Sequence, residues 1–165
     1  MPILDDRNLE FFSHSPEQTR RMGIYLGGYL KTGDAICLEG DLGSGKTTLV
    51  QGIAQGWGAS DPVSSPTYLI VNEYRRPDSQ RLFHLDAYRL RNALDAEMID
   101  FDRMLEQGPI VIEWAERIRE ILPENYLWIG LSYLGVGHRA MLLTPHGKLY
   151  EDIVGYLRRK LYGDF

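Results

Sequence analysis

Hydrophobic and polar positions divide the chain into short apolar runs and longer segments with helical spacing. The runs at 35–38 and 110–112 contain no charged or amide residue, which is typical of strands covered on both faces of a sheet. A short first strand is predicted at 9–12. The segments 68–74 and 81–88 predict a hairpin, because the intervening RRPDSQ is rich in turn-forming residues.

A second hairpin is predicted near the end of the chain, where YLWIGLSYL and RAMLLTP flank Gly135-Val136-Gly137-His138. The first helix is predicted to begin at Ser15-Pro16-Glu17-Gln18, because Ser15 can cap it, Pro16 suits its first turn and Gln18 can complete a capping box. It should end near Lys31, before the turn Thr32-Gly33-Asp34. Further helices are expected from about residue 46 to 57, over 92–106, over 115–122 and from about 149 to 161.

Strands that interleave with helices favour an α/β fold. We expect three layers, with a mixed, mainly parallel sheet and helices on both faces. The 165 residues suggest one domain spanning 1–165. Hydrophobic content of 44% and charged content of 25% are typical of a globular protein rather than a disordered one.

Charge and cysteine content narrow the range of partners and compartments. A formal net charge of −5 argues against a protein that holds DNA or RNA by itself through phosphate neutralisation. Cys37 is the one cysteine, so no internal disulfide can form and a reducing compartment is favoured. The first residues lack the pattern of a signal peptide, and no apolar run is long enough to span a bilayer. We therefore expect a cytoplasmic protein without membrane contact.

The segment from Gly40 to Thr47, GDLGSGKT, matches the phosphate-binding loop pattern G-x-x-x-x-G-K-[ST]. Glycines let the backbone curve closely, so that successive N–H groups can point at phosphate oxygens. Lys46 supplies a compact positive charge for the β- and γ-phosphates, and the Thr47 hydroxyl can ligate Mg²⁺. An apolar strand before the loop and an amphipathic helix after it fit this interpretation. The pattern thus predicts binding of a nucleoside triphosphate with Mg²⁺.

Two carboxylates follow apolar strands and are candidates for the acidic partner that such loops need. Asp86 ends LFHLD and Glu113 ends IVIE. Either could be an ordinary strand-end carboxylate, but strand ends carry the site in this class of fold. Ser64-Ser65-Pro66-Thr67-Tyr68 could be a switch loop near the γ-phosphate or an ordinary turn. The four histidines, His14, His84, His138 and His146, have no metal-ligand spacing and are interpreted as structural or surface residues.

Taken together, these segments resemble the TsaE (YjeE) family of P-loop ATPases in bacterial tRNA threonylcarbamoyladenosine (t6A) synthesis. The segments that carry the resemblance are GDLGSGKTTLVQG (40–52), SPTYLIVNEY (65–74), HLDAYRL (84–90) and IVIEWAERI (110–118). The resemblance implies an ATP- and Mg²⁺-dependent enzyme with a P-loop NTPase-like fold. It implies catalytic roles for Asp86, Glu113 and Lys46, and a metal site at Thr47 and Glu113. The residues expected to bind the nucleotide are Glu17, Asp41, Leu42, Gly43, Ser44, Gly45, Lys46, Thr47, Thr48 and Arg139.

The same resemblance implies the TsaB and TsaD proteins as partners, with tRNA reached only through that complex. The partners would modify adenosine 37 of tRNAs reading ANN codons, and this chain would support their repeated turnover. Two other classes are considered. A small-molecule P-loop kinase would usually add an arginine-rich lid and an acceptor pocket, and AYRLRN offers arginines without a clear lid. A non-hydrolysing adaptor would need Lys46 but neither Asp86 nor Glu113.

Overall fold

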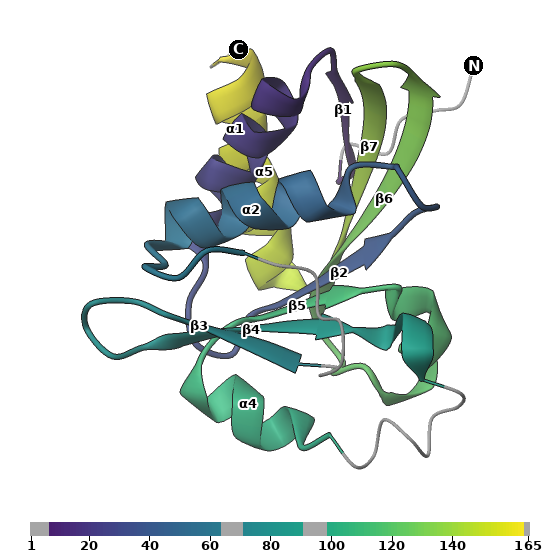
Figure 1. Ribbon diagram of the computed structural model, residues 1–165. Helices are drawn as coiled ribbons and strands as arrows, with labels where there is room; N and C mark the ends of the chain where they lie inside the picture. The colour runs from purple at the N-terminus through teal and green to yellow at the C-terminus, as the bar shows by residue number, and fades with distance from the viewer. Residues whose placement is uncertain (1–6, 64–70, 91–98, 164–165) are drawn as a thin grey trace.

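A computed structural model describes residues 7–63, 71–90 and 99–163 of the chain. Strands and helices alternate along it, as the sequence predicts (Figure 1). In chain order the elements are β1 (Leu9–Ser13), α1 (Pro16–Tyr29), β2 (Ala35–Glu39), α2 (Lys46–Trp57), β3 (Val71–Arg75), β4 (Arg81–Asp86), the 3₁₀ turn η1 (Ala87–Arg89), α4 (Phe101–Gln107), β5 (Ile110–Glu113), the 3₁₀ helix η2 (Ala115–Ile121), β6 (Tyr126–Gly135), β7 (His138–His146) and α5 (Lys148–Tyr162).

One mixed sheet runs through the described part of the chain, with seven strands in the order β1-β7-β6-β2-β5-β4-β3. The central pairs β6–β2, β2–β5 and β5–β4 are parallel. The outer pairs are antiparallel, and two of them are the predicted hairpins β3–β4 and β6–β7. This arrangement confirms the α/β fold with a sheet that is parallel at its centre.

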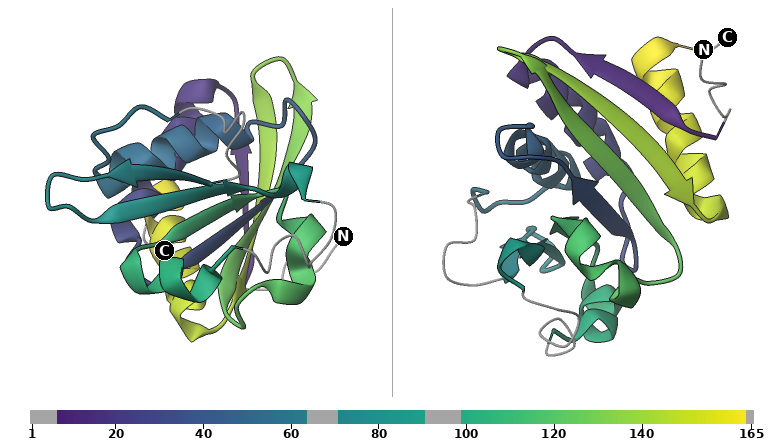
Figure 2. Two further views of the ribbon diagram at one scale, coloured as in Figure 1. Left: turned by 60° about the horizontal axis from the view of Figure 1, so that its bottom comes forward. Right: turned by 90° about the vertical axis from the view of Figure 1, so that its right-hand side faces the viewer.

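Helices cover both faces of the sheet, which confirms the three-layer prediction (Figures 1 and 2). Alternate residues of β2 explain the two cores, because successive side chains of a strand point to opposite faces. Ile36 and Leu38 belong to the larger core, which is shared with α1, α2 and α5. Cys37 belongs to the smaller core, which contains residues of β4, α4, β5 and η2. Since both faces of β2 are buried, the strand reads as a continuous apolar run.

Helices α1 and α2 approach each other through glycines on both sides. A Cβ atom added at Gly27 would lie 2.0 Å from the carbonyl oxygen of Ile53, and one at Gly56 would lie 2.0 Å from that of Ile24. Gly52 has a similarly close neighbour, the Arg20 carbonyl oxygen at 2.2 Å. The two helix backbones are therefore in direct contact, and this contact fixes the position of the helix that follows the glycine-rich loop.

The start of α1 differs in one detail from the predicted capping box. Ser15 Oγ accepts a hydrogen bond from the Gln18 backbone N–H at 3.1 Å, as expected. The Gln18 side chain, however, accepts from the backbone N–H of His14 at 2.7 Å. The reciprocal bond therefore reaches one residue further back than a capping box requires.

Three predicted boundaries also need correction. The helix predicted over 92–106 is described only from residue 99; Ile99 and Asp100 are not helical, and α4 begins at Phe101 because Asp100 Oδ1 caps the Arg103 N–H. The segment 115–122 forms a kinked 3₁₀ helix. The strand predicted over 81–88 ends at Asp86, and residues 68–70 lie outside the described part. Within the described residues, no helix has the length and apolar character needed to cross a membrane.

Candidate functional site

The glycine-rich loop joins the end of β2 to the start of α2, as its sequence predicts. Gly43 and Gly45 have φ angles of 80° and 102°, in the left-handed region that favours glycine. Gly45 caps α2 without a side-chain hydrogen bond. The first N–H groups of a helix have no partner within the helix, so at this end they can be donated to an anion.

Lys46 lies at the centre of the site and is buried. Its Nζ donates hydrogen bonds to the carbonyl oxygens of Gly40 and Asp41, the second at 3.0 Å. The same ammonium lies 4.2 Å from the centroid of the Trp114 ring. Burial lowers the pKa of Lys46, and this effect is opposed by nearby carboxylates, first that of Glu113. The lysine is therefore held in place by the loop's own backbone and by an aromatic face.

Asp86 and Glu113 end two neighbouring parallel strands, β4 and β5, and they are register partners across that pair. The structure thus brings together the two carboxylates that the sequence separates by more than twenty residues. Both act on the charge of Lys46, since each raises its pKa. Asp86 Oδ1 also accepts the Tyr88 backbone N–H at 2.9 Å and so caps η1.

Two side chains at this edge have contacts that sequence reasoning missed. His84 Nε2 lies 2.5 Å from Glu113 Oε2, and His84 Nδ1 lies 2.8 Å from the Tyr74 hydroxyl. His84 is fully buried, and each of its ring nitrogens has a hydrogen-bond partner. Trp114 has a φ of 58°, unusual for a non-glycine residue, and its ring lies against Tyr88 as well as Lys46. In the sequence, the signal for a special role of His84 is that it is the polar residue of the otherwise apolar run LFHL.

Arg139 lies on the other side of the loop, at the start of β7. A Cβ atom added at Gly45 would lie 3.6 Å from the Arg139 side chain. Arg139 Nε is buried and has no hydrogen-bond partner within the described residues. A narrow cleft of about 30 Å³ is lined by Gly45, Thr48, Arg139 and the start of α1, where Glu17 is exposed in the first turn. Thr48 and Arg139 therefore lie together beside Gly45, and Glu17 follows Pro16 of the same cleft in the first turn of α1.

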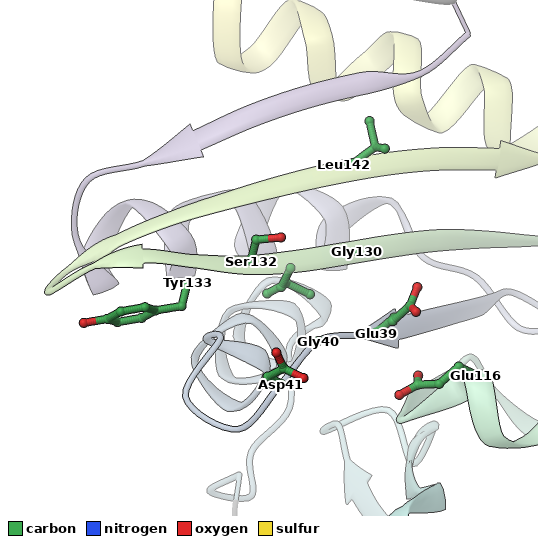
Figure 3. A pocket seen from close by; sticks show the side chains of 9 residues that line it. Glu39, Gly40, Asp41, Glu116, Gly130, Ser132, Tyr133 and Leu142 are labelled. Atoms are coloured by element: carbon green, nitrogen blue, oxygen red, sulfur yellow. The ribbon is translucent and has the colours of Figure 1, made fainter. Parts of the chain in front are cut away.

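A larger pocket of about 660 Å³ lies between the start of the loop, β6 and η2 (Figure 3). Its carboxylates are Glu39, Asp41 and Glu116, with Tyr133 and Ser132 on the β6 side. Burial, followed by the charge of Glu39, raises the pKa of Glu116. A triphosphate would be repelled by such a group of carboxylates. Of the loop residues assigned to nucleotide binding, Asp41 faces this acidic pocket and Leu42 is exposed at the loop tip.

The sequence also singled out a polar loop, four histidines and a metal site. The segment Ser64–Tyr68, with Thr67, lies outside the described residues. Two of the four histidines, His14 and His138, lie together, with their Nδ1 atoms 3.1 Å apart. Among the described residues, no three or more His, Cys, Asp or Glu side chains form a group that could hold a metal ion by themselves.

The fold and this edge define the chain as a P-loop-type α/β protein. A family model described as "Threonylcarbamoyl adenosine biosynthesis protein TsaE" matches residues 13–141. A curated relative from a Nostoc species, a tRNA threonylcarbamoyladenosine biosynthesis protein TsaE, is 37% identical and covers 90% of this chain and 93% of its own. The protein of the same name from Bacillus subtilis is 35% identical and covers 93% and 96%. The crystal structure of Bacillus subtilis YdiB superposes with a TM-score of 0.76 at 32% identity, covering 93% of this chain and 95% of its own. The chain belongs to the TsaE family.

Proposed function

We propose that this protein binds ATP with Mg²⁺ at the glycine-rich loop and hydrolyses it in support of tRNA threonylcarbamoyladenosine synthesis. One observation carries the proposal: Lys46 is buried between the loop and two strand-end carboxylates, Asp86 and Glu113. A positive charge beside the start of a helix suits phosphate, and carboxylates beside it suit a divalent cation. The names of the relatives supply the pathway.

The loop offers the phosphates three kinds of donor. These are the backbone N–H groups at the start of α2, the Lys46 ammonium, and the unpartnered Nε of Arg139 beside Gly45. The carboxylates of the larger pocket disfavour phosphate, so we place the triphosphate at the start of α2. Thr48 lines the cleft on that side, and Glu17 lies in the adjoining first turn of α1, from which it can approach the nucleoside.

The donor set also fits Mg²⁺, which prefers oxygen ligands and binds through one or two protein oxygens together with substrate phosphates. The Thr47 hydroxyl and the Glu113 carboxylate would hold it, and bound Mg²⁺ would neutralise charge on the phosphates. Asp86 and Glu113 then have separate tasks. Glu113 would serve the metal or the attacking water, and Asp86, one strand away, would be a second acidic group needed for turnover.

Substitution of Lys46 tests nucleotide binding. Lys46→Ala should weaken ATP binding roughly 100-fold or more, since a hydrogen bond to a charged group contributes about 1.5–3 kcal/mol and Lys46 can make more than one. Titration calorimetry with Mg·ATP measures this loss. Lys148→Ala is the matched control, because Lys148 is exposed and pairs only with groups of α5 among its described contacts. Near-normal ATP affinity in a folded Lys46→Ala protein would refute the site.

Substitution of the two carboxylates separates binding from chemistry. Asp86→Ala and Glu113→Ala should each bind ATP measurably but hydrolyse it about 10²-fold more slowly, the usual contribution of one positioned catalytic group. Phosphate release under saturating ATP measures the rate. Turnover equal to wild type in both variants would show that the hydrolytic assignment is wrong.

We propose TsaB and TsaD as the partners through which the chain reaches tRNA. A net charge of −5 gives no strong attraction to tRNA, so contact through another protein is favoured. The purified chain should hydrolyse ATP slowly and bind a TsaB–TsaD pair more tightly with ATP than without it. Pull-downs with and without ATP test the coupling, together with a tRNA modification assay using Glu113→Ala. Equally tight association with and without ATP, or full multiple turnover with the Glu113→Ala variant, would contradict the proposed coupling.

A further inference from the structure

A chain of hydrogen bonds crosses three neighbouring strands beneath the loop. It runs from the Tyr74 hydroxyl on β3 to His84 on β4, and from His84 to Glu113 on β5, with separations of 2.8 Å and 2.5 Å. The side chain of His84 has no exposed surface, and that of Glu113 is 7% exposed. His84 lies two residues before Asp86 on the same face of β4. The chain therefore connects the apolar interior with the edge where the site lies.

The chemistry of the three groups fixes the direction of these bonds. A carboxylate only accepts hydrogen bonds, so with Glu113 ionised the proton between the two residues belongs to His84 Nε2. In the neutral imidazole Nδ1 is then an acceptor, and the Tyr74 hydroxyl can donate to it. Each ring nitrogen of His84 thus has a matching partner, and the imidazole ring cannot rotate without losing both bonds.

We infer that His84 is a positioning residue that holds the Glu113 carboxylate in the orientation needed at the loop. This inference rests on the proposed ATPase function. A glutamate side chain has several rotatable bonds, and fixing it costs conformational entropy. Binding one carboxylate oxygen to a buried imidazole removes that freedom in advance and leaves the second oxygen for the metal or its water. Partners of this kind typically change metal affinity or activity roughly 10- to 100-fold when removed.

A core histidine with a purely structural task would occupy the same place, so the experiment must separate the two. In His84→Gln the side-chain amide can still donate toward Glu113, whereas His84→Leu removes the donor. We expect hydrolysis roughly 10- to 100-fold slower in His84→Leu with an almost unchanged KM, and a clear recovery in His84→Gln. His146→Gln, the same change at an exposed histidine of β7, should leave the rate unaltered.

A double substitution tests whether His84 acts through Glu113. If it does, the His84→Leu, Glu113→Gln protein should hydrolyse ATP no more slowly than Glu113→Gln. If the rate losses of the two single variants multiply in the double variant, His84 has a structural role and the inference is overturned. Equal rates for wild type and His84→Leu would also overturn it, while leaving the proposed function intact. Absence of hydrolysis in the wild-type protein under every condition would instead refute the proposed function.

A spectroscopic measurement tests the geometry without nucleotide and without relying on a folded leucine variant. The ¹⁵N spectrum of the imidazoles should show His84 with its proton on Nε2, and His84→Gln identifies the signal by its loss. Tyr74→Phe removes the hydroxyl that bonds His84 Nδ1 and should shift the Nδ1 resonance, while the proton stays on Nε2 because the Glu113 carboxylate still accepts from it. A wild-type His84 protonated on Nδ1 alone, or a signal unchanged in Tyr74→Phe, would contradict the hydrogen-bond chain.

Discussion

The glycine contact between α1 and α2 predicts a large cost for adding one methyl group at Gly27. The new Cβ of Gly27→Ala would lie 2.0 Å from the Ile53 carbonyl oxygen and 2.8 Å from its carbonyl carbon, whereas ordinary contact begins near 3.4 Å. Both neighbours are backbone atoms of α2, so no side chain can rotate away. The helices would have to separate locally by more than an ångström.

The magnitude follows from two opposing effects. Overpacking a well-filled interior costs typically 1–3 kcal/mol, and a rigid backbone neighbour places this site at the upper end. Replacing glycine by alanine within a helix returns up to about 1 kcal/mol. We therefore expect Gly27→Ala to lose about 2 kcal/mol of unfolding free energy, equivalent to a fall in Tm of roughly 4–8 °C for a chain of this size.

Gly155→Ala is the matched control, because the added Cβ would approach nothing closer than the flexible end of Arg159 at 3.7 Å. It should stabilise the protein by up to about 1 kcal/mol. Gly23→Ala, whose closest backbone neighbour would be at 2.6 Å, should lie between the two. Urea unfolding with far-UV circular dichroism gives the free energies. Equal stabilisation at Gly27 and Gly155 would refute the backbone contact.

Three further predictions concern single side chains. Burial raises the pKa of the Cys37 thiol to about 12, so a disulfide reagent at pH 8 should label the native protein hardly at all and the unfolded protein fully; rapid native labelling would contradict the burial. Burial also raises the pKa of Asp34 in the folded protein, so its ionisation opposes folding, and the associated stability is present at low pH and lost as the pH rises through the raised value. Asp34→Asn, which keeps an acceptor for the Lys31 N–H, should therefore gain stability relative to wild type as the pH rises from 3 to 7. A difference in unfolding free energy between the two proteins that stays constant over this pH range in urea unfolding would contradict this. Ser15→Ala removes the cap of α1 and should cost about 1 kcal/mol in the same assay; an unchanged midpoint would mean that the cap is compensated.

The local parts of the fold and site could be predicted from the sequence. The loop lies where an apolar strand meets Gly40–Thr47, because glycine, lysine and threonine at that spacing have a local physical meaning. Asp86 and Glu113 could be proposed because each ends an apolar run. That they are register partners depends on the order of the strands, which no local pattern contains.

Contacts between distant segments could not be predicted. The pairing of β1 with β7 joins residues more than a hundred positions apart, and it determines where Arg139 lies relative to the start of α1. His84 was judged by its spacing from other histidines, whereas its partners come from adjacent strands. The left-handed backbone at Trp114 has no sequence signal comparable to a glycine, yet it places the ring over Lys46.

The contacts of Lys46 have a consequence for which anions the loop can hold. Its ammonium is already bound by the Gly40 and Asp41 carbonyl oxygens and by the face of Trp114. An anion that takes this lysine must exchange for those contacts, so the net gain is the difference between two sets of interactions. A ligand of low charge density would gain almost nothing from the exchange. The occupied ammonium thereby lowers the net free energy that any anion could gain from Lys46.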